Sequence, residues 1–177
     1  MMVVSVDQLK NMKIAIISDS HDNLPNMYKA IEWMNKNGIE EIIHCGDVCA
    51  PAALREIAKK FKGKIHLVYG NVDGDHEGMK KKAEESGNVI IYGDEGHLKF
   101  GEKKIAFVHY PIIAKELAKS GKYDFVFYGH SHKPWEEMVG NCKMLNPGTL
   151  AGMFYKATFA VWDTENNKFE LKILELL

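Results

Sequence analysis

Residues 12–23 read MKIAIISDSHDN, an apolar run that is followed at once by Asp19 and His21. The run over 13–18 predicts a strand buried on both faces, because its apolar residues do not alternate with polar ones. Residues 23–37 then carry a capping Asn, an early Pro and an amphipathic pattern, which together predict a helix. A buried strand followed by such a helix is typical of an α/β sheet.

The same succession of strand and helix continues along the chain. We expect further strands over 41–44, 64–69, 89–92, 97–100, 103–109 and 123–128, and further helices over 51–61, 76–86 and 111–120. Beyond these the pattern changes, and antiparallel strands are expected over 135–139, 143–145, 155–163 and 169–174. We expect this antiparallel half to pack against the first sheet, so that two stacked sheets form one domain.

Seven side chains able to bind metal follow the ends of five of the expected strands. They are Asp19, His21, Asp47, Asn71, His109, His130 and His132. Ligands of open α/β sheets gather outside the carboxyl ends of the strands, so we expect the seven to form a metal site along one edge of a sheet. Taken alone, the pair Asp19 and His21 is weak evidence, because a strand-end Asp can equally cap the next helix.

Composition and charge limit the classes of protein to which this chain can belong. The 177 residues are 46% hydrophobic, which is enough to bury the core of one globular domain. A formal net charge of -1 leaves no excess of basic residues for a nucleic-acid backbone, so we expect no polymeric nucleic acid as partner. Three cysteines without a C-x-x-C pair favour reduced thiols in a cytoplasmic protein. No apolar stretch has the length of a membrane span or a signal peptide, so no membrane association is expected.

The first residues are interpreted separately from the domain, because the sequence from residue 12 onward already reads as a complete domain. We therefore treat 1–11 as an N-terminal extension and 12–177 as a single domain. Two interpretations of the extension remain open, an upstream translation start and a short extra strand.

The order of the short motifs carries a family resemblance. D-x-H at 19–21, G-D at 46–47, G-N-x-D at 70–73, a strand-end His at 109 and G-H-x-H at 129–132 resemble the calcineurin-like metallophosphoesterase superfamily. The short chain, the SDSHDN opening and the NPG at 146–148 are similar to its small bacterial and archaeal phosphodiesterases of the YfcE type. The resemblance implies a four-layer α-β-β-α sandwich of two mixed sheets. It also implies hydrolysis of a small phosphodiester substrate.

The resemblance also implies roles for the seven side chains. Asp19, His21 and His132 would hold a first ion, Asn71, His109 and His130 a second, and Asp47 would bridge the two. Asn71 and His109 would in addition contact the phosphate through the metal site and act in catalysis. Mixed N and O ligands suit divalent transition ions, with Mn or Ni favoured by the resemblance and Fe, Co or Zn as alternatives. A hydroxide bridging the ions is the expected nucleophile.

Two positions depart from relatives in the superfamily. Val72 stands where a G-N-H-D motif has a His that is thought to protonate the leaving group, and Tyr110 stands where many relatives have Gly. Fast cleavage of esters with poor leaving groups is therefore in doubt. The alternatives are a scaffold of the same fold that binds partner proteins, like the phosphoesterase-like subunit of retromer, and a phosphomonoesterase. A homo-oligomer is also left open.

Other polar residues have more ordinary interpretations. We expect His44 and His66 to be hydrogen-bonded core residues, and His76 and His97 to lie in loops. Asp73 is expected to orient a ligand or its loop. For Asn23, capping of the helix and orientation of a phosphate both stay open. The loops after the candidate ligands carry no aromatic pair suited to clamping a base, so nucleotide specificity has no support from the sequence.

Overall fold

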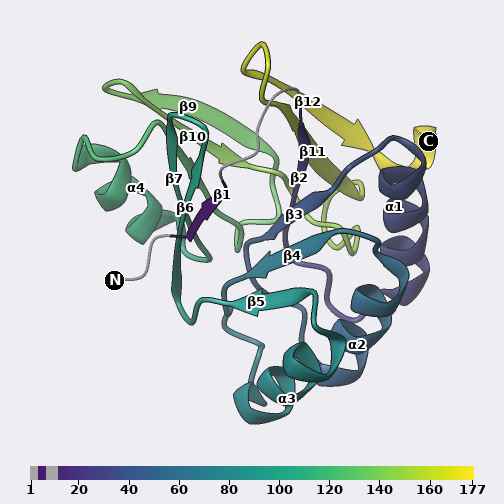
Figure 1. Cartoon of the computed structure of the whole chain (residues 1–177). Helices are drawn as coiled ribbons and strands as arrows, with labels where there is room; N and C mark the ends of the chain where they lie inside the picture. Colours follow the sequence, from purple (N-terminus) through teal and green to yellow (C-terminus); the bar gives the residue numbers. More distant parts are fainter. Residues whose placement is uncertain (1–3, 7–11) are drawn as a thin grey trace.

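The computed structural model describes residues 4–6 and 12–177, and its strands form two six-stranded sheets that face each other (Figure 1). The first sheet has the order β12-β11-β2-β3-β4-β5, and the second has the order β1-β6-β7-β8-β10-β9. The strands of the first sheet are β2 (Lys13–Ile17), β3 (Glu41–His44), β4 (Lys64–Leu67), β5 (Val89–Ile91), β11 (Thr158–Asp163) and β12 (Lys168–Ile173). Those of the second are β1 (Val4–Val6), β6 (Glu95–Phe100), β7 (Lys103–Val108), β8 (Phe125–Phe127), β9 (Trp135–Val139) and β10 (Cys142–Asn146).

Helices cover the outer face of each sheet. The described helices are α1 (Leu24–Lys36), α2 (Pro51–Lys60), α3 (His76–Ser86) and α4 (Pro111–Lys119), followed by a 3₁₀ turn at Leu174–Leu176. Figure 1 shows α1, α2 and α3 together on one side and α4 on the opposite side. Both sheets contain parallel and antiparallel pairs. The expected four-layer α-β-β-α sandwich of two mixed sheets is confirmed.

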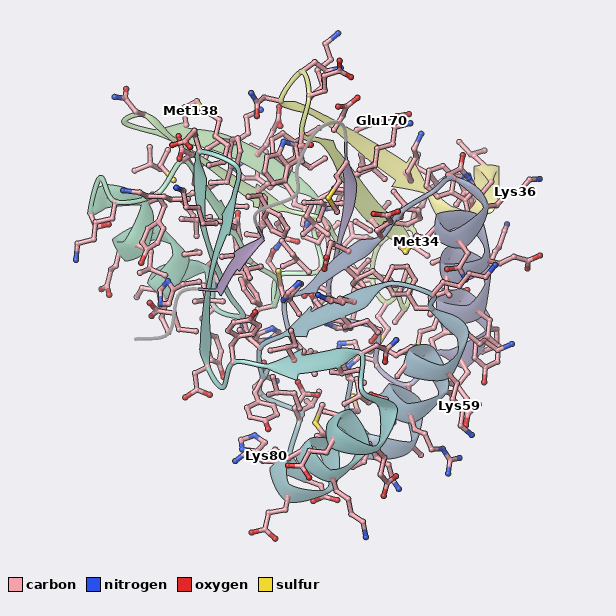
Figure 2. All side chains as sticks on the ribbon, in the orientation of Figure 1. Met34, Lys36, Lys59, Lys80, Met138 and Glu170 are labelled. Carbon is pink, nitrogen blue, oxygen red and sulfur yellow. The ribbon has the colours of Figure 1, made fainter. Side chains whose placement is uncertain are left out.

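Apolar side chains fill each of the three spaces between the four layers. On α1, Met27, Ala30, Ile31 and Met34 are buried at the spacing of one helix face, which packs on the first sheet. In Figure 2, Met34 points from α1 toward the sheet, whereas Lys36 and Lys59 lie at the outer surface. Between the sheets, the fully buried rings include Phe107, Phe127 and Trp162.

The C-terminal strands do not form one antiparallel half, so this part of the expectation is wrong. The antiparallel pair β9 and β10 joins the second sheet, where β10 runs parallel to β8 with Met144 opposite Val126. The hairpin of β11 and β12 instead extends the first sheet, where Ala160 lies opposite Ile16 of β2. Each antiparallel pair therefore extends a different sheet. The loop over 147–157 connects β10 of the second sheet to β11 of the first.

The N-terminal extension contributes one strand to the described structure. Residues 4–6 form β1, which pairs parallel with β6 so that Val4 lies opposite Leu98. The remaining residues of the predicted extension, 1–3 and 7–11, lie outside the described part of the chain, and the domain boundary at residue 12 stays a prediction. Within the described part, none of the helices combines the length and the apolar character needed to cross a membrane.

Candidate metal centre

The seven candidate ligands lie together at the carboxyl ends of five strands from both sheets. In the first sheet, Asp19 and His21 follow β2, Asp47 follows β3 and Asn71 follows β4. In the second sheet, His109 follows β7, while His130 and His132 follow β8. The expectation of a site along one edge of one sheet is therefore wrong. The residues straddle the two sheets, because the carboxyl ends of β7 and β8 meet those of β2, β3 and β4.

A first group of side chains consists of Asp19, His21, Asp47 and His132. One ligand atom from each of the four lies within 4.8 Å of all the others. The Nε2 atoms of His21 and His132 are 3.2 Å apart, and His132 Nε2 is 3.2 Å from Asp19 Oδ1. All four side chains are buried or half-buried.

A second group consists of Asp47, Asn71, His109 and His130. Asn71 Oδ1 lies 2.9 Å from His109 Nε2 and 2.9 Å from His130 Nδ1. Those two imidazole nitrogens are 3.3 Å apart. Asp47 belongs to both groups, because its Oδ2 is 3.4 Å from His109 Nε2 and 3.8 Å from His21 Nε2.

The spacing of these atoms suits metal ligation. Ligand atoms held about 2.1 Å from a common ion lie about 3 to 3.4 Å from one another, which is close to the separations within each group. Asp19 Oδ1 is buried and has no hydrogen bond from any described residue, and the same is true of His132 Nδ1. A buried carboxylate oxygen without a donor is costly, and a cation would compensate it. Both groups therefore fit a divalent ion.

Electrostatics at the centre follow from burial and from the Asp47–His109 pair. Burial raises the pKa of the Asp19 carboxyl. Burial would also raise the pKa of Asp47, but His109 and the backbone N–H of Val72 outweigh it and hold that pKa below its ordinary value. Burial would lower the pKa of His109, yet Asp47 raises it above the ordinary value. Asp47 is thus more readily ionised than Asp19.

The surrounding backbone fixes the orientation of the candidate ligands. His109 Nδ1 is 2.8 Å from the carbonyl oxygen of Cys45, so its Nε2 is left to face the centre. Asp73 accepts hydrogen bonds from the backbone N–H groups of Asp47, Cys49 and Gly70, at 2.9, 2.7 and 2.7 Å. The expected role of Asp73 in holding this loop is confirmed.

The short motifs need glycine because neighbouring atoms lie very close to the backbone at these positions. A Cβ at Gly70 would collide with the carboxylate of Asp47, and one at Gly46 would lie 2.8 Å from His109 Nδ1. A Cβ at Gly129 would collide with the hydroxyl of Ser18. Glycine is therefore needed in the G-D, G-N and G-H pairs because a larger residue would collide with a side chain at or next to the centre.

Five of the seven candidate ligands adopt left-handed backbone conformations. Their φ angles are 52° at Asp19, 42° at His21, 61° at Asp47, 67° at His130 and 59° at His132. Such a conformation costs a residue other than glycine on the order of 1 kcal/mol or more. Backbone hydrogen bonds between the turns help to hold these conformations, such as those from Asp19 N–H to the Gly46 carbonyl oxygen and from His21 N–H to the Asp47 carbonyl oxygen, both at 3.0 Å.

For the remaining histidines, some of the expected placements are confirmed and others are wrong. His44 is buried, with its Nε2 3.0 Å from the hydroxyl of Ser20, and His66 is buried between Glu41 and Tyr92. Both are core residues, as expected. His97 is not in a loop: it lies in β6, with its Nε2 2.9 Å from Glu95 Oε1. The strand expected over 97–100 already included His97, so the loop expectation conflicted with the strand expectation, and the strand is the one confirmed. The loop expectation for His76 is also wrong, because His76 is the first residue of α3.

Asn23 acts as a helix cap. Its Oδ1 accepts a hydrogen bond from the Asn26 N–H, and its Nδ2 donates to the carbonyl oxygen of Ala151 at 2.9 Å. Both polar ends of the side chain therefore have protein partners. Of the two interpretations left open by the sequence, this geometry favours capping.

Three neighbours of the centre were not among the candidate site residues chosen from the sequence. Cys49 Sγ lies 3.6 Å from His21 Nδ1. The Phe154 ring lies 5.6 Å from that of His132. Asn146 donates to the carbonyl oxygen of Gly129 at 2.8 Å, which supports the turn that carries His130 and His132. No local pattern marks these contacts, because the partners are separated by 17 to 28 positions in the chain.

Comparison with known proteins agrees with this geometry. The family model of the calcineurin-like phosphoesterase superfamily domain matches residues 12–167. Phosphodiesterase MJ0936 of Methanocaldococcus jannaschii is 34% identical over 93% of this chain and 100% of its own length. A solved structure described as a novel archaeal phosphodiesterase has a TM-score of 0.85 at 33% identity, covering 92% of this chain and 99% of that chain. Vacuolar Protein Sorting 29 of Cryptosporidium parvum shares the fold, with a TM-score of 0.64 at 20% identity over 92% and 96% of the two chains. The chain belongs to the calcineurin-like phosphoesterase superfamily.

Proposed function

We propose that the protein is a metal-dependent phosphodiesterase with a binuclear centre. The observation that carries the proposal is the position of Asp47, whose Oδ2 is 3.8 Å from His21 Nε2 of the first group and 3.4 Å from His109 Nε2 of the second. A carboxylate shared by two sets of ligands is what a pair of divalent ions needs to limit their mutual repulsion. The relative from Methanocaldococcus jannaschii, which is named a phosphodiesterase, supports the reaction class.

In this proposal each group of side chains holds one ion. Asp19, His21 and His132 bind the first, Asn71, His109 and His130 bind the second, and Asp47 bridges them. Imidazole, carboxamide and carboxylate ligands suit Mn, Ni, Fe, Co or Zn, and we favour Mn or Ni. When bound, two such ions supply positive charge for the phosphate and a bridging hydroxide as the nucleophile.

The protein groups around the ions determine how a phosphodiester is held. Only Asp19 and Asp47 among the seven ligands are anionic, so the loaded centre keeps a net positive charge that attracts the phosphate. Asn71 follows β4 of the first sheet and His109 follows β7 of the second, with Asn71 Oδ1 2.9 Å from His109 Nε2. Both would hold the second ion, and we assign them the contacts to the phosphate in the transition state. Val72 is 41% exposed and apolar, and it offers only its backbone N–H, which bonds to Asp47 Oδ1. The leaving group therefore receives no proton from this position.

The test is reconstitution of the chelated protein with Mn²⁺, followed by metal analysis and assay with an aryl phosphodiester. We expect two ions per chain and recovery of turnover. Asp47→Asn should lose more metal and more rate than His21→Ala or Asn71→Ala, because only Asp47 contacts both groups. Asp94→Asn, at an exposed turn, is the matched control and should behave like the parent. Retention of two ions and near-normal turnover by Asp47→Asn would refute the bridging assignment.

The competing proposal is a scaffold that binds partner proteins, as the shared fold of Vacuolar Protein Sorting 29 allows. Its 20% identity carries the fold alone. All seven candidate ligands are present and converge in this chain, which favours the enzyme. The same experiment separates the two, since a scaffold would bind metal without turning over the ester. We also propose a cytoplasmic location, because the three cysteines are free in the described structure.

A further inference from the structure

A pocket of about 360 Å³ lies beside the turn that carries His130 and His132, and none of its lining residues is one of the seven candidate ligands. Its lining residues are Pro111, Tyr128, Ser131, Lys133, Trp135 and Tyr155. Ser131 and Lys133 lie on either side of His132 in the chain, and the ring of Tyr110, the neighbour of Pro111, is 5.0 Å from that of His130. The turn that provides two candidate ligands therefore also forms a wall of this pocket, which we call the aromatic pocket.

Two large rings of the aromatic pocket remain accessible. Trp135 is 51% exposed and Tyr155 is 46% exposed, although both are of the size that proteins usually bury. The ammonium of Lys133 lies 5.1 Å from the centre of the Trp135 ring. Accessible rings beside a positive charge, in a concave site next to the turn that carries two candidate metal ligands, are typical of a ligand site. Flat π systems stack on such rings with a preferred geometry, which aliphatic groups cannot reproduce.

The walls of the aromatic pocket are held in place by the sheet. Trp135 is the first residue of β9 and lies opposite Asn146 in β10. Asn146 Nδ2 donates to Ser131 Oγ at 3.0 Å and to the carbonyl oxygen of Gly129 at 2.8 Å. Asn146 thus links the two walls, through its strand pairing with Trp135 and through its side-chain hydrogen bond to Ser131. A pocket arranged in advance loses less free energy when it orders a ligand.

We infer that the aromatic pocket receives a flat aromatic arm of the phosphodiester, an aryl group or a nucleobase, while the phosphate lies at the metal centre. The inference rests on the proposed function and names its class of substrate. Trp135 and Tyr155 stack on the arm, and the positive charge of Lys133 in the pocket wall attracts the anionic ester. Neither ring touches the reacting atoms, so both residues determine specificity and are not catalytic.

The test compares two probes that differ in the flat ring alone. Phenylphosphonate and cyclohexylphosphonate carry the same number of carbon atoms and the same anionic group, and their binding to the Mn²⁺-loaded protein is measured by calorimetry. Burial of apolar area alone favours cyclohexyl or neither. Stacking favours phenyl, by about 3- to 10-fold in Kd.

Variants test whether the preference for phenylphosphonate arises from the aromatic pocket. Trp135→Leu and Tyr155→Leu should each bring the ratio of the two Kd values close to one. Each should still bind Mn²⁺ as the parent does, because neither side chain belongs to the ligand groups. Met138→Ala is the matched control, because Met138 lies on the same strand as Trp135, is 58% exposed and sits at the edge of the molecule in Figure 2. It should keep the phenyl preference.

Turnover of bis(4-nitrophenyl) phosphate, measured in parallel, separates this inference from the proposed function. Turnover together with equal affinity for both probes overturns the aromatic pocket alone. A phenyl preference that survives both leucine variants also overturns it. A phenyl preference that depends on Trp135 and Tyr155, without turnover of any diester, overturns the phosphodiesterase and retains the pocket as a ligand site.

Discussion

Replacement of His44 by Asn should make the metal-free protein less sensitive to acid. His44 is fully buried at the end of β3, where its Nδ1 accepts a hydrogen bond from the Gly46 N–H at 3.2 Å. Burial lowers the pKa of this imidazole to about 4, against 6.5 for the free side chain. An Asn carbonyl can accept the same hydrogen bond, but it does not titrate in this range.

The sign of the effect follows from proton binding. Between pH 6.5 and pH 4 the unfolded chain protonates His44 and the folded chain does not, so the stability falls as the pH falls. With these two pKa values, the His44 contribution to the free energy of unfolding drops by about 2 kcal/mol between pH 7 and pH 4.5. The variant has no such contribution, whatever its stability at pH 7.

Urea unfolding with chelator, at pH 7 and pH 4.5, measures this contribution for the parent and for His44→Asn. We expect the stability difference between parent and variant to shrink by about 2 kcal/mol, or to reverse, at the lower pH. Titrating groups that do not interact with His44 are common to both proteins and cancel in the comparison. Equal losses of stability in the two proteins would refute the assignment of a neutral, buried His44.

Two further predictions concern the loop that follows β4. Gly70→Ala should weaken Mn²⁺ binding by about 10-fold or more, because its Cβ would displace the Asp47 carboxylate. At Gly74 an added Cβ would meet no atom of the described residues within 4 Å, so Gly74→Ala should bind like the parent in a metal titration. Parent-like affinity in Gly70→Ala would show that the loop can move without cost. The missing acid at Val72 should make the rate fall steeply as the leaving-group pKa rises in a series of diesters, and Val72→His should restore up to about 100-fold for the poorest leaving groups. A flat dependence in the parent protein would show that another group already supplies the proton.

The local elements could be predicted from the sequence because their signals are local. The apolar run over 13–18, the cap at Asn23 and the early prolines of the helices are read within a few residues, and α3 lies where the pattern places it. The seven candidate ligands could also be selected in this way, since each follows the carboxyl end of a buried strand. Their convergence was predictable for this reason, even though the strands belong to two different sheets.

Which strands pair was decided by tertiary structure alone. The hairpin of β11 and β12 and the pair of β9 and β10 look alike as sequence, yet one extends the first sheet and the other the second. The sequence indicated no aromatic pair near the centre, whereas folding brings Trp135 and Tyr155, 20 positions apart, into one pocket. Strand patterning reports which face of a strand is buried, but the partner of that face depends on packing between distant segments. The positions of the candidate metal ligands could therefore be predicted from the ends of the strands. The residues that form the pocket walls beside them could be identified only from the packing of the whole sandwich.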